Sequence, residues 1–118
     1  MPATINVITK THEDQIQAIA ALKAKGEKGQ VCFVSSTADL DFMVQRAYDS
    51  MKDNPNITHT IWIVAASSTA WTDKVVEASK WLTNLVKDVN EEHGVHVLFV
   101  STREYTELLT RTTDTEIL

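Results

Sequence analysis

The chain contains the stretch Ile61-Trp62-Ile63-Val64-Ala65-Ala66-Ser67-Ser68-Thr69, in which an apolar run rich in β-branched residues stops at three hydroxyl side chains. A helical pattern follows this stretch. The same succession of apolar run, hydroxyl-bearing loop and helical pattern begins at three further places, residues 5–9, 31–37 and 97–102. Strands that alternate with helices in this way predict a mostly parallel sheet whose strands are joined by right-handed crossovers.

Hydrophobic spacing predicts the positions of the individual elements. It places strands at 5–8, 30–35, 60–65 and 96–100, and helices at about 12–24, 38–52, 71–92 and from 103 onward. We therefore expect a single small three-layer α/β domain over residues 1–110, with a four-stranded, mostly parallel sheet, helices on both faces and a C-terminal tail at 111–118. The expected architecture is flavodoxin-like or Rossmann-like, with the strand order 2-1-3-4 or 3-2-1-4. Because the strand at 30–35 is apolar at consecutive positions, the sequence places it in the centre of the sheet.

Composition limits the class of protein. The chain has 118 residues, of which 43% are hydrophobic and 23% charged, as in a globular domain. The formal net charge of −5 argues against non-specific binding of nucleic acid. No stretch approaches the roughly 18 apolar residues that a membrane span needs, and the N-terminus lacks an apolar leader, so we expect a cytoplasmic protein. Cys32 is the only cysteine, and its apolar neighbours predict a buried, inert thiol.

Hydroxyl side chains gather where the strands end. In a parallel sheet these ends share one edge, which is where open α/β sheets bind ligands. Together with free N–H groups at helix N-termini, they form a candidate phosphate or nucleotide site. None of these loops contains a glycine, so no dinucleotide- or triphosphate-binding motif is present, and we expect no cofactor. The candidate ligand-binding residues are Ser36, Thr37, Ser68, Thr69, Trp71 and Thr102, and the acidic candidates are Asp39 and Asp73.

Simpler roles account for the same residues. Ser, Thr and Asp before a helix cap its first turn, and Trp71 begins the apolar stripe of the helix at 71–92. First-turn acids complement the helix dipole, which leaves a metal-assisted enzyme as the weakest hypothesis. His59, His93 and His96 are predicted at the opposite edge of the sheet, where we expect surface loop positions because no metal-ligand spacing accompanies them.

The helix at 71–92 has a wider apolar surface than one core-facing stripe requires, because Val76, Trp81 and Val86 flank the main row. Such a band predicts either a deeply packed helix or a surface for a protein partner or a homodimer. No complete catalytic constellation is present, so catalytic residues are not assigned. The sequence therefore favours a small binding or regulatory protein acting through protein–protein contacts. The alternative is a nucleotide- or phosphate-binding module, with or without hydrolytic activity, at the hydroxyl edge.

Overall fold

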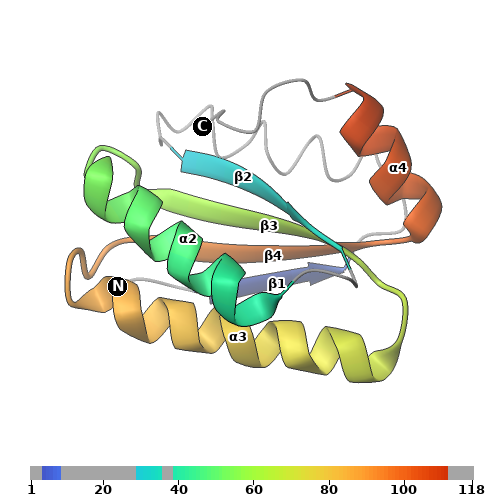
Figure 1. Cartoon of the computed structure of the whole chain (residues 1–118), viewed down its shortest axis with the longest axis horizontal. Helices are drawn as coiled ribbons and strands as arrows, with labels where there is room; N and C mark the ends of the chain where they lie inside the picture. The colour runs from blue at the N-terminus through green and yellow to red at the C-terminus, as the bar shows by residue number, and fades with distance from the viewer. Residues whose placement is uncertain (1–3, 9–28, 36–38, 112–118) are drawn as a thin grey trace.

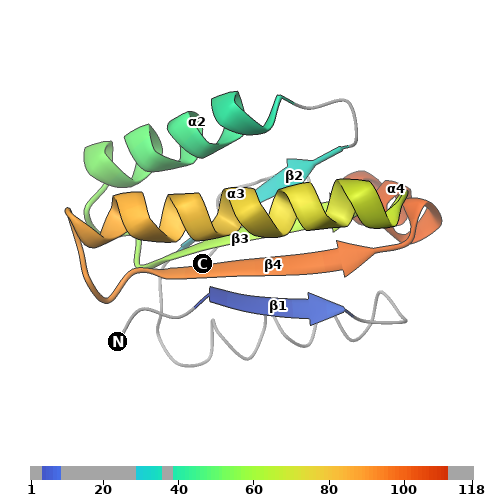
Figure 2. The same cartoon turned by 90° about the horizontal axis from the view of Figure 1, so that it is seen from below.

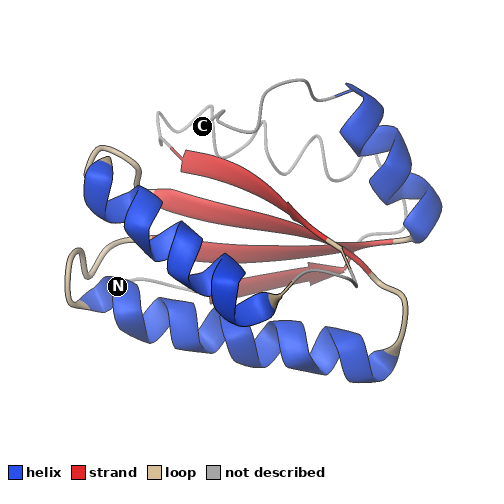
Figure 3. Ribbon diagram, in the orientation of Figure 1, coloured by secondary structure: helices blue, strands red, loops and turns tan. Residues whose placement is uncertain are grey.

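The computed structural model describes residues 4–8, 29–35 and 39–111. Within these ranges, parallel strands alternate with helices in a small α/β domain (Figure 3). The predicted helix at 12–24 and nearly all of the predicted tail lie outside the described residues. Of the helices in the described ranges, none combines the length and apolar character needed to cross a membrane. The order along the chain is β1 (Thr4–Ile8), β2 (Gly29–Val34), α2 (Leu40–Asp53), β3 (His59–Ala65), α3 (Thr69–Lys87), β4 (Gly94–Val100) and α4 (Thr102–Arg111) (Figure 1).

The strands pair in the order β1-β4-β3-β2, and every neighbouring pair is parallel. This order corrects the expected orders 2-1-3-4 and 3-2-1-4. From β2 to β3 and from β3 to β4 the chain advances by one strand each time. Strand β1 then pairs with β4, the last of the described strands, at the side of the sheet away from β2.

Strand β2 pairs only with β3 among the described strands, so the prediction of a central position is wrong. Its two faces are nevertheless covered, because Val31 belongs to the hydrophobic core on one side of the sheet and Val34 to the core on the other. A strand with apolar residues at consecutive positions is buried on both faces of the sheet. This pattern does not indicate whether the strand has one neighbouring strand or two.

Side-chain alternation divides the core between the two faces of the sheet. Trp62 and Val97 point to the face that α2 and α3 cover, and Figures 1 and 2 both show these two helices side by side on it. Ile61 and Leu98 point the other way and pack against Leu108 of α4. The sheet therefore carries described helices on both faces.

Helix α3 ends at Lys87 and not at Glu92, the end that apolar spacing predicts. The carbonyl of Val86 accepts hydrogen bonds from the backbone N–H groups of Val89 and Asn90, at 3.0 and 2.8 Å. The Asn90 side chain then accepts a bond from the N–H of Glu92 at 3.0 Å. The turn contains no glycine or proline, but Asn90 is a residue type that also commonly follows the end of a helix.

Candidate functional site

The carboxyl ends of β3 and β4 are neighbours, and the helices that follow them leave for opposite faces of the sheet. Open α/β sheets bind ligands where two adjacent loops diverge in this way. The backbone N–H of Ala66 donates to the carbonyl of Val100 at 2.7 Å, which holds the two loops together. Ser68, Thr69 and the other candidates that follow β3 thus lie at the same edge as the start of α4. The structure brings together two of the predicted hydroxyl loops.

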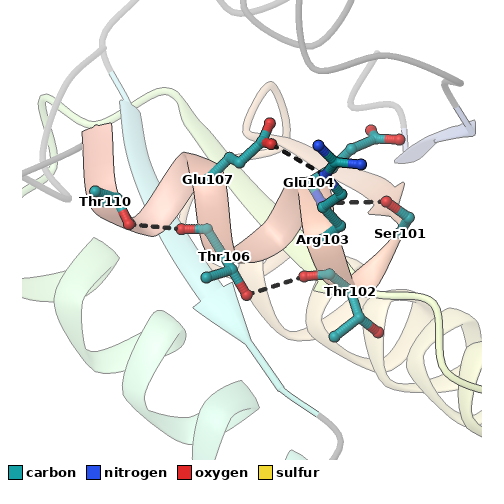
Figure 4. A network of polar contacts seen from close by, with 7 residues as sticks. All are labelled: Ser101, Thr102, Arg103, Glu104, Thr106, Glu107 and Thr110. Atoms are coloured by element: carbon teal, nitrogen blue, oxygen red, sulfur yellow. Dashed lines mark hydrogen bonds and ion pairs between the residues drawn. The ribbon is translucent and has the colours of Figure 1, made fainter.

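Several polar side chains at this edge accept hydrogen bonds from backbone N–H groups in the first turn of a helix. Ser68 Oγ accepts a hydrogen bond from the N–H of Trp71 at 3.1 Å, at the start of α3. Ser101 Oγ accepts one from the N–H of Glu104 at 3.1 Å, at the start of α4 (Figure 4). A carboxylate oxygen of Asp39 accepts from two N–H groups at the start of α2. These contacts satisfy donors that a helix leaves open at its first turn.

The side chain of Trp71 forms a hydrogen bond with the last residue of β3. Its indole N–H donates to the carbonyl of Ala65 at 2.9 Å, and the ring packs, partly buried, against the core beneath α3. Thr69, Asp73 and Thr102 are more open, with exposed side chains. The remaining predicted ligand-binding residues, Ser36 and Thr37, lie outside the described residues.

Helix α4 uses its hydroxyls internally. Thr106 Oγ1 donates to the carbonyl of Thr102 at 3.0 Å, and Thr110 Oγ1 donates to that of Thr106 at 2.9 Å (Figure 4). Arg103 Nε and Glu107 Oε1 form an exposed ion pair at 3.4 Å, one helical turn apart. The hydroxyls of Thr106 and Thr110 therefore bond within the helix, and those bonds leave fewer donors for a ligand.

The three residues of the apolar band predicted on α3 differ in how far they are exposed. Val86 is only 1% exposed and belongs to the core, and Val76 packs against the core from a half-buried position. Trp81 keeps 47% of its surface exposed. Phe42, in the first turn of α2, is 61% exposed and lies on the side of the helix opposite the buried Val44, Ala47 and Met51. Of the predicted partner residues, Trp81 alone has a largely open side chain.

At the opposite edge of the sheet three histidines lie close together. Nδ1 of His59 and Nε2 of His96 are 2.8 Å apart, and Nε2 of His93 lies 2.8 Å from Thr60 Oγ1. His93 is 0% exposed and His96 is also buried, while His59 is half-buried. The expectation of surface loop histidines is therefore wrong, although their shared edge is confirmed. His96 alternates with Val95 and Val97 inside an apolar strand, a signal that indicates burial on the second face.

Burial sets the charge state of these rings. It lowers the pKa of His93 to about 4, a trend that the neighbouring His59 reinforces and the Ile57 carbonyl opposes. Burial likewise lowers the pKa of His96 to about 4, with help from the charges of His59 and His93. Because an isolated histidine has a pKa of about 6.5, both rings are neutral at pH 7.

Glycine makes room for the histidine pair. Gly94 is the register partner of His59 on β4. A Cβ at this position would lie 2.5 Å from His59 Nδ1 and 2.9 Å from His96 Nε2. Any larger residue would therefore push the two rings apart. Despite the proximity of the histidines, the described residues contain no group of three or more side chains arranged to hold a metal ion.

The thiol of Cys32 is partly buried, where the sequence predicts a buried one. Cys32 is half-buried in β2, and its burial raises the pKa to about 11, against a smaller opposing effect of Arg46. Since the thiolate is the nucleophile, a raised pKa leaves the group protonated at pH 7.

No protein-family model matches the chain, and no curated protein or solved structure matches it either.

Proposed function

We propose that this chain is a small binding or regulatory domain that acts through protein–protein contacts made by the outer face of α2 and α3. One observation carries the proposal: each of these helices exposes a large aromatic side chain, Phe42 at 61% and Trp81 at 47%. Aromatic side chains are enriched at protein interfaces, and tryptophan is among the residues that most often dominate their binding energy.

The two helices that carry these aromatic side chains are neighbours on the same face of the sheet. Helices α2 and α3 lie side by side over the sheet (Figure 2). Their buried residues form one core cluster with those of the strands beneath them. Side chains as exposed as Phe42 and Trp81 therefore project away from the sheet. Leu109 of α4, 43% exposed, lies on a helix that packs against the other face and offers a comparison position.

We take a second copy of this chain as the first partner. In a two-fold dimer the same patch contacts itself, so one exposed aromatic face on each copy is sufficient to build an interface. We also propose a cytoplasmic location. It is supported by the single cysteine, since small domains of oxidising compartments are commonly held together by disulfides.

Sedimentation equilibrium over a wide concentration range tests this function. The unmodified chain is expected to dimerise, and both Trp81→Glu and Phe42→Glu are expected to shift the equilibrium toward monomer, because each places a charge in an apolar contact. Leu109→Glu adds the same charge on the other side of the sheet and is expected to leave association unchanged. Circular dichroism and thermal unfolding of each variant establish that it folds.

A nucleotide- or phosphate-binding module at the carboxyl edge is our second candidate. It is favoured by the divergence of the loops after β3 and β4, where exposed Thr69 and Thr102 lie at adjacent strand ends. The test is a thermal-shift series with inorganic phosphate, nucleotides and sugar phosphates. A ligand at 100 times its dissociation constant stabilises a protein by about 2.7 kcal/mol.

Variants separate this site from chance binding. The ligand-induced shift is expected to disappear in the double variant Ser68→Ala with Thr69→Ala. Thr106→Ala removes a hydroxyl that is bonded within α4, and it should leave the shift intact. If none of these ligands raises the melting temperature, or if the double variant responds like the unmodified chain, the carboxyl-edge site is wrong.

A further inference from the structure

Lys74, Trp81 and Asp88 form a row along the outer side of α3. Each is separated from the next by seven residues in the sequence. Since two turns of an α-helix take up about seven residues, the three side chains leave the helix in nearly the same direction. Asp88 is the C-cap of α3 and has an αR backbone, so the row continues to the end of the helix. We call these three residues the outer row.

The outer row is open to solvent. Lys74 and Asp88 are exposed, and Trp81 keeps 47% of its surface exposed. Leu85, one helical turn after Trp81, is half-buried and packs against the core at the border of the row. A half-exposed tryptophan beside an apolar border offers area that a partner can cover, and the charges on either side of it are typical of the rim of an interface.

The two ends of the outer row carry opposite charges, at equal distances along the helix from Trp81. The row is therefore complementary to a reversed copy of itself. When two copies meet in antiparallel orientation with Trp81 against the partner's Trp81, Lys74 of each copy faces the partner's Asp88. In parallel orientation, Lys74 would instead face the partner's Lys74, which costs energy because the charges are alike.

An antiparallel contact of this kind has the two-fold symmetry of most homodimers. In a two-fold interface the residue on the axis contacts its own copy, and every other contact occurs twice. Trp81 on the axis forms an aromatic pair, and the contact between Lys74 and the partner's Asp88 is made once on each side of it. Because the formal net charge of −5 makes two copies repel each other overall, their contact requires local attraction of this kind.

We propose that the outer row is the centre of an antiparallel, two-fold contact between two copies of this chain, with Trp81 on the axis and an ion pair between Lys74 and the partner's Asp88 on each side. This inference rests on the proposed protein-contact function. It adds the helix that forms the centre of the interface, the orientation of the two copies and the register between them.

Charge reversal measured by sedimentation equilibrium of the full chain tests the contact. Lys74→Glu makes two carboxylates face each other in both pairs, so the dissociation constant of the dimer is expected to rise about tenfold. Asp88→Lys makes two ammonium groups face each other and is expected to weaken the dimer similarly, although it brings the net charge of −5 closer to zero. The control is Lys80→Glu, which makes the same charge change at an exposed position of α3 outside the row and should leave the constant unchanged.

An equimolar mixture of Lys74→Glu and Asp88→Lys tests the register. In an antiparallel contact between the two variants, position 74 of each chain faces an opposite charge at position 88 of the other. The mixture should therefore contain more dimer than either variant alone at the same total concentration. In a parallel contact, each single variant exchanges one like-charged pair for another and is not weakened. A mixture that is no more dimeric than its components overturns the inference.

The same measurements separate this inference from the proposed function. If Trp81→Glu weakens the dimer while Lys74→Glu and Asp88→Lys behave like Lys80→Glu, the protein-contact function stands and the antiparallel contact is wrong. If the unmodified chain is monomeric, or if Trp81→Glu has no effect, both are wrong.

Salt provides a check on the cause of the effect. In about 1 M salt, where charges are screened within a few ångströms, the difference between Lys74→Glu and the unmodified chain should shrink. Circular dichroism establishes that each variant folds. A difference that salt leaves unchanged would show that the variant does not act through its charge, and it would overturn the inference.

Discussion

Nδ1 of His59 and Nε2 of His96 lie 2.8 Å apart, although the two residues are separated by 37 positions in the sequence. Their rings approach with centroids 4.9 Å apart and tilted planes. The contact ties β3 to β4 at the amino edge of the sheet, in the space that Gly94 leaves open. It makes the stability of this edge depend on pH and on the absence of a Cβ at one position.

The stability of the whole domain is expected to decrease in acid. The unfolded chain binds protons at the ordinary histidine pKa of about 6.5, whereas His93 and His96 in the fold bind them near 4. The neutral rings therefore stabilise the fold fully above about pH 6.5, and this contribution is lost as the pH falls toward 4. At about 1.4 kcal/mol per pKa unit, the loss is on the order of 3 kcal/mol for each ring.

Urea unfolding at a series of pH values between 7.5 and 4.5 measures this loss. The control is a variant in which His93 is replaced by Asn, which removes one of the two buried rings and should flatten the curve. A free energy of unfolding that stays constant from pH 7 to 5 would contradict the burial of neutral histidines.

Gly94→Ala is expected to destabilise the chain by about 1–3 kcal/mol, because the added methyl group overpacks the histidine pair. Urea unfolding at pH 7.5 measures the change. Adding His59→Ala removes one of the two rings that the methyl group meets, so the double variant should lose less than the sum of the single variants. Strict additivity would show that the cost of the added methyl group arises elsewhere.

Ser68→Ala is expected to lower the free energy of unfolding by about 1 kcal/mol through loss of the α3 cap. Ser68→Asp, which retains an oxygen acceptor and adds a charge that favours the helix dipole, should restore most of this loss. Thermal unfolding of the three chains provides the comparison. If the alanine and aspartate variants behave alike, Ser68 does not act as the cap.

Cys32 is expected to react slowly with a thiol reagent at pH 7.5, because burial raises its pKa to about 11. In the folded chain the rate should be at least about tenfold below that of the same chain in urea, where the thiol is exposed and has its ordinary pKa of about 8.5. Absorbance of the released reagent group follows the reaction. Equal rates in both conditions would show that the thiol is open in the fold.

The fold class and most element positions could be predicted because they depend on local spacing. The strand predicted at 60–65 is β3 at His59–Ala65, and the helix predicted at 38–52 is α2 at Leu40–Asp53. Strand order could not be predicted, because an apolar strand such as β2 is covered on both faces at an edge as well as in the centre.

The candidate sites show the same difference between local and non-local information. The cap formed by Ser68 depends on residues within one helical turn and follows from the sequence. The contact of His59 with His96 depends on the register between two strands, which brings Gly94 opposite His59 and which no local pattern specifies. The exposure of Phe42, by contrast, follows from local helical spacing, because Phe42 lies opposite the buried Val44, Ala47 and Met51.

The most direct test of the proposed function is sedimentation equilibrium of the unmodified chain beside Trp81→Glu and Leu109→Glu. If the outer face of α2 and α3 is a protein-contact surface, the unmodified chain and Leu109→Glu dimerise with equal constants, and Trp81→Glu is at least about tenfold weaker. A chain that stays monomeric at every concentration, or a Trp81→Glu variant that dimerises like the unmodified chain, would contradict the proposal.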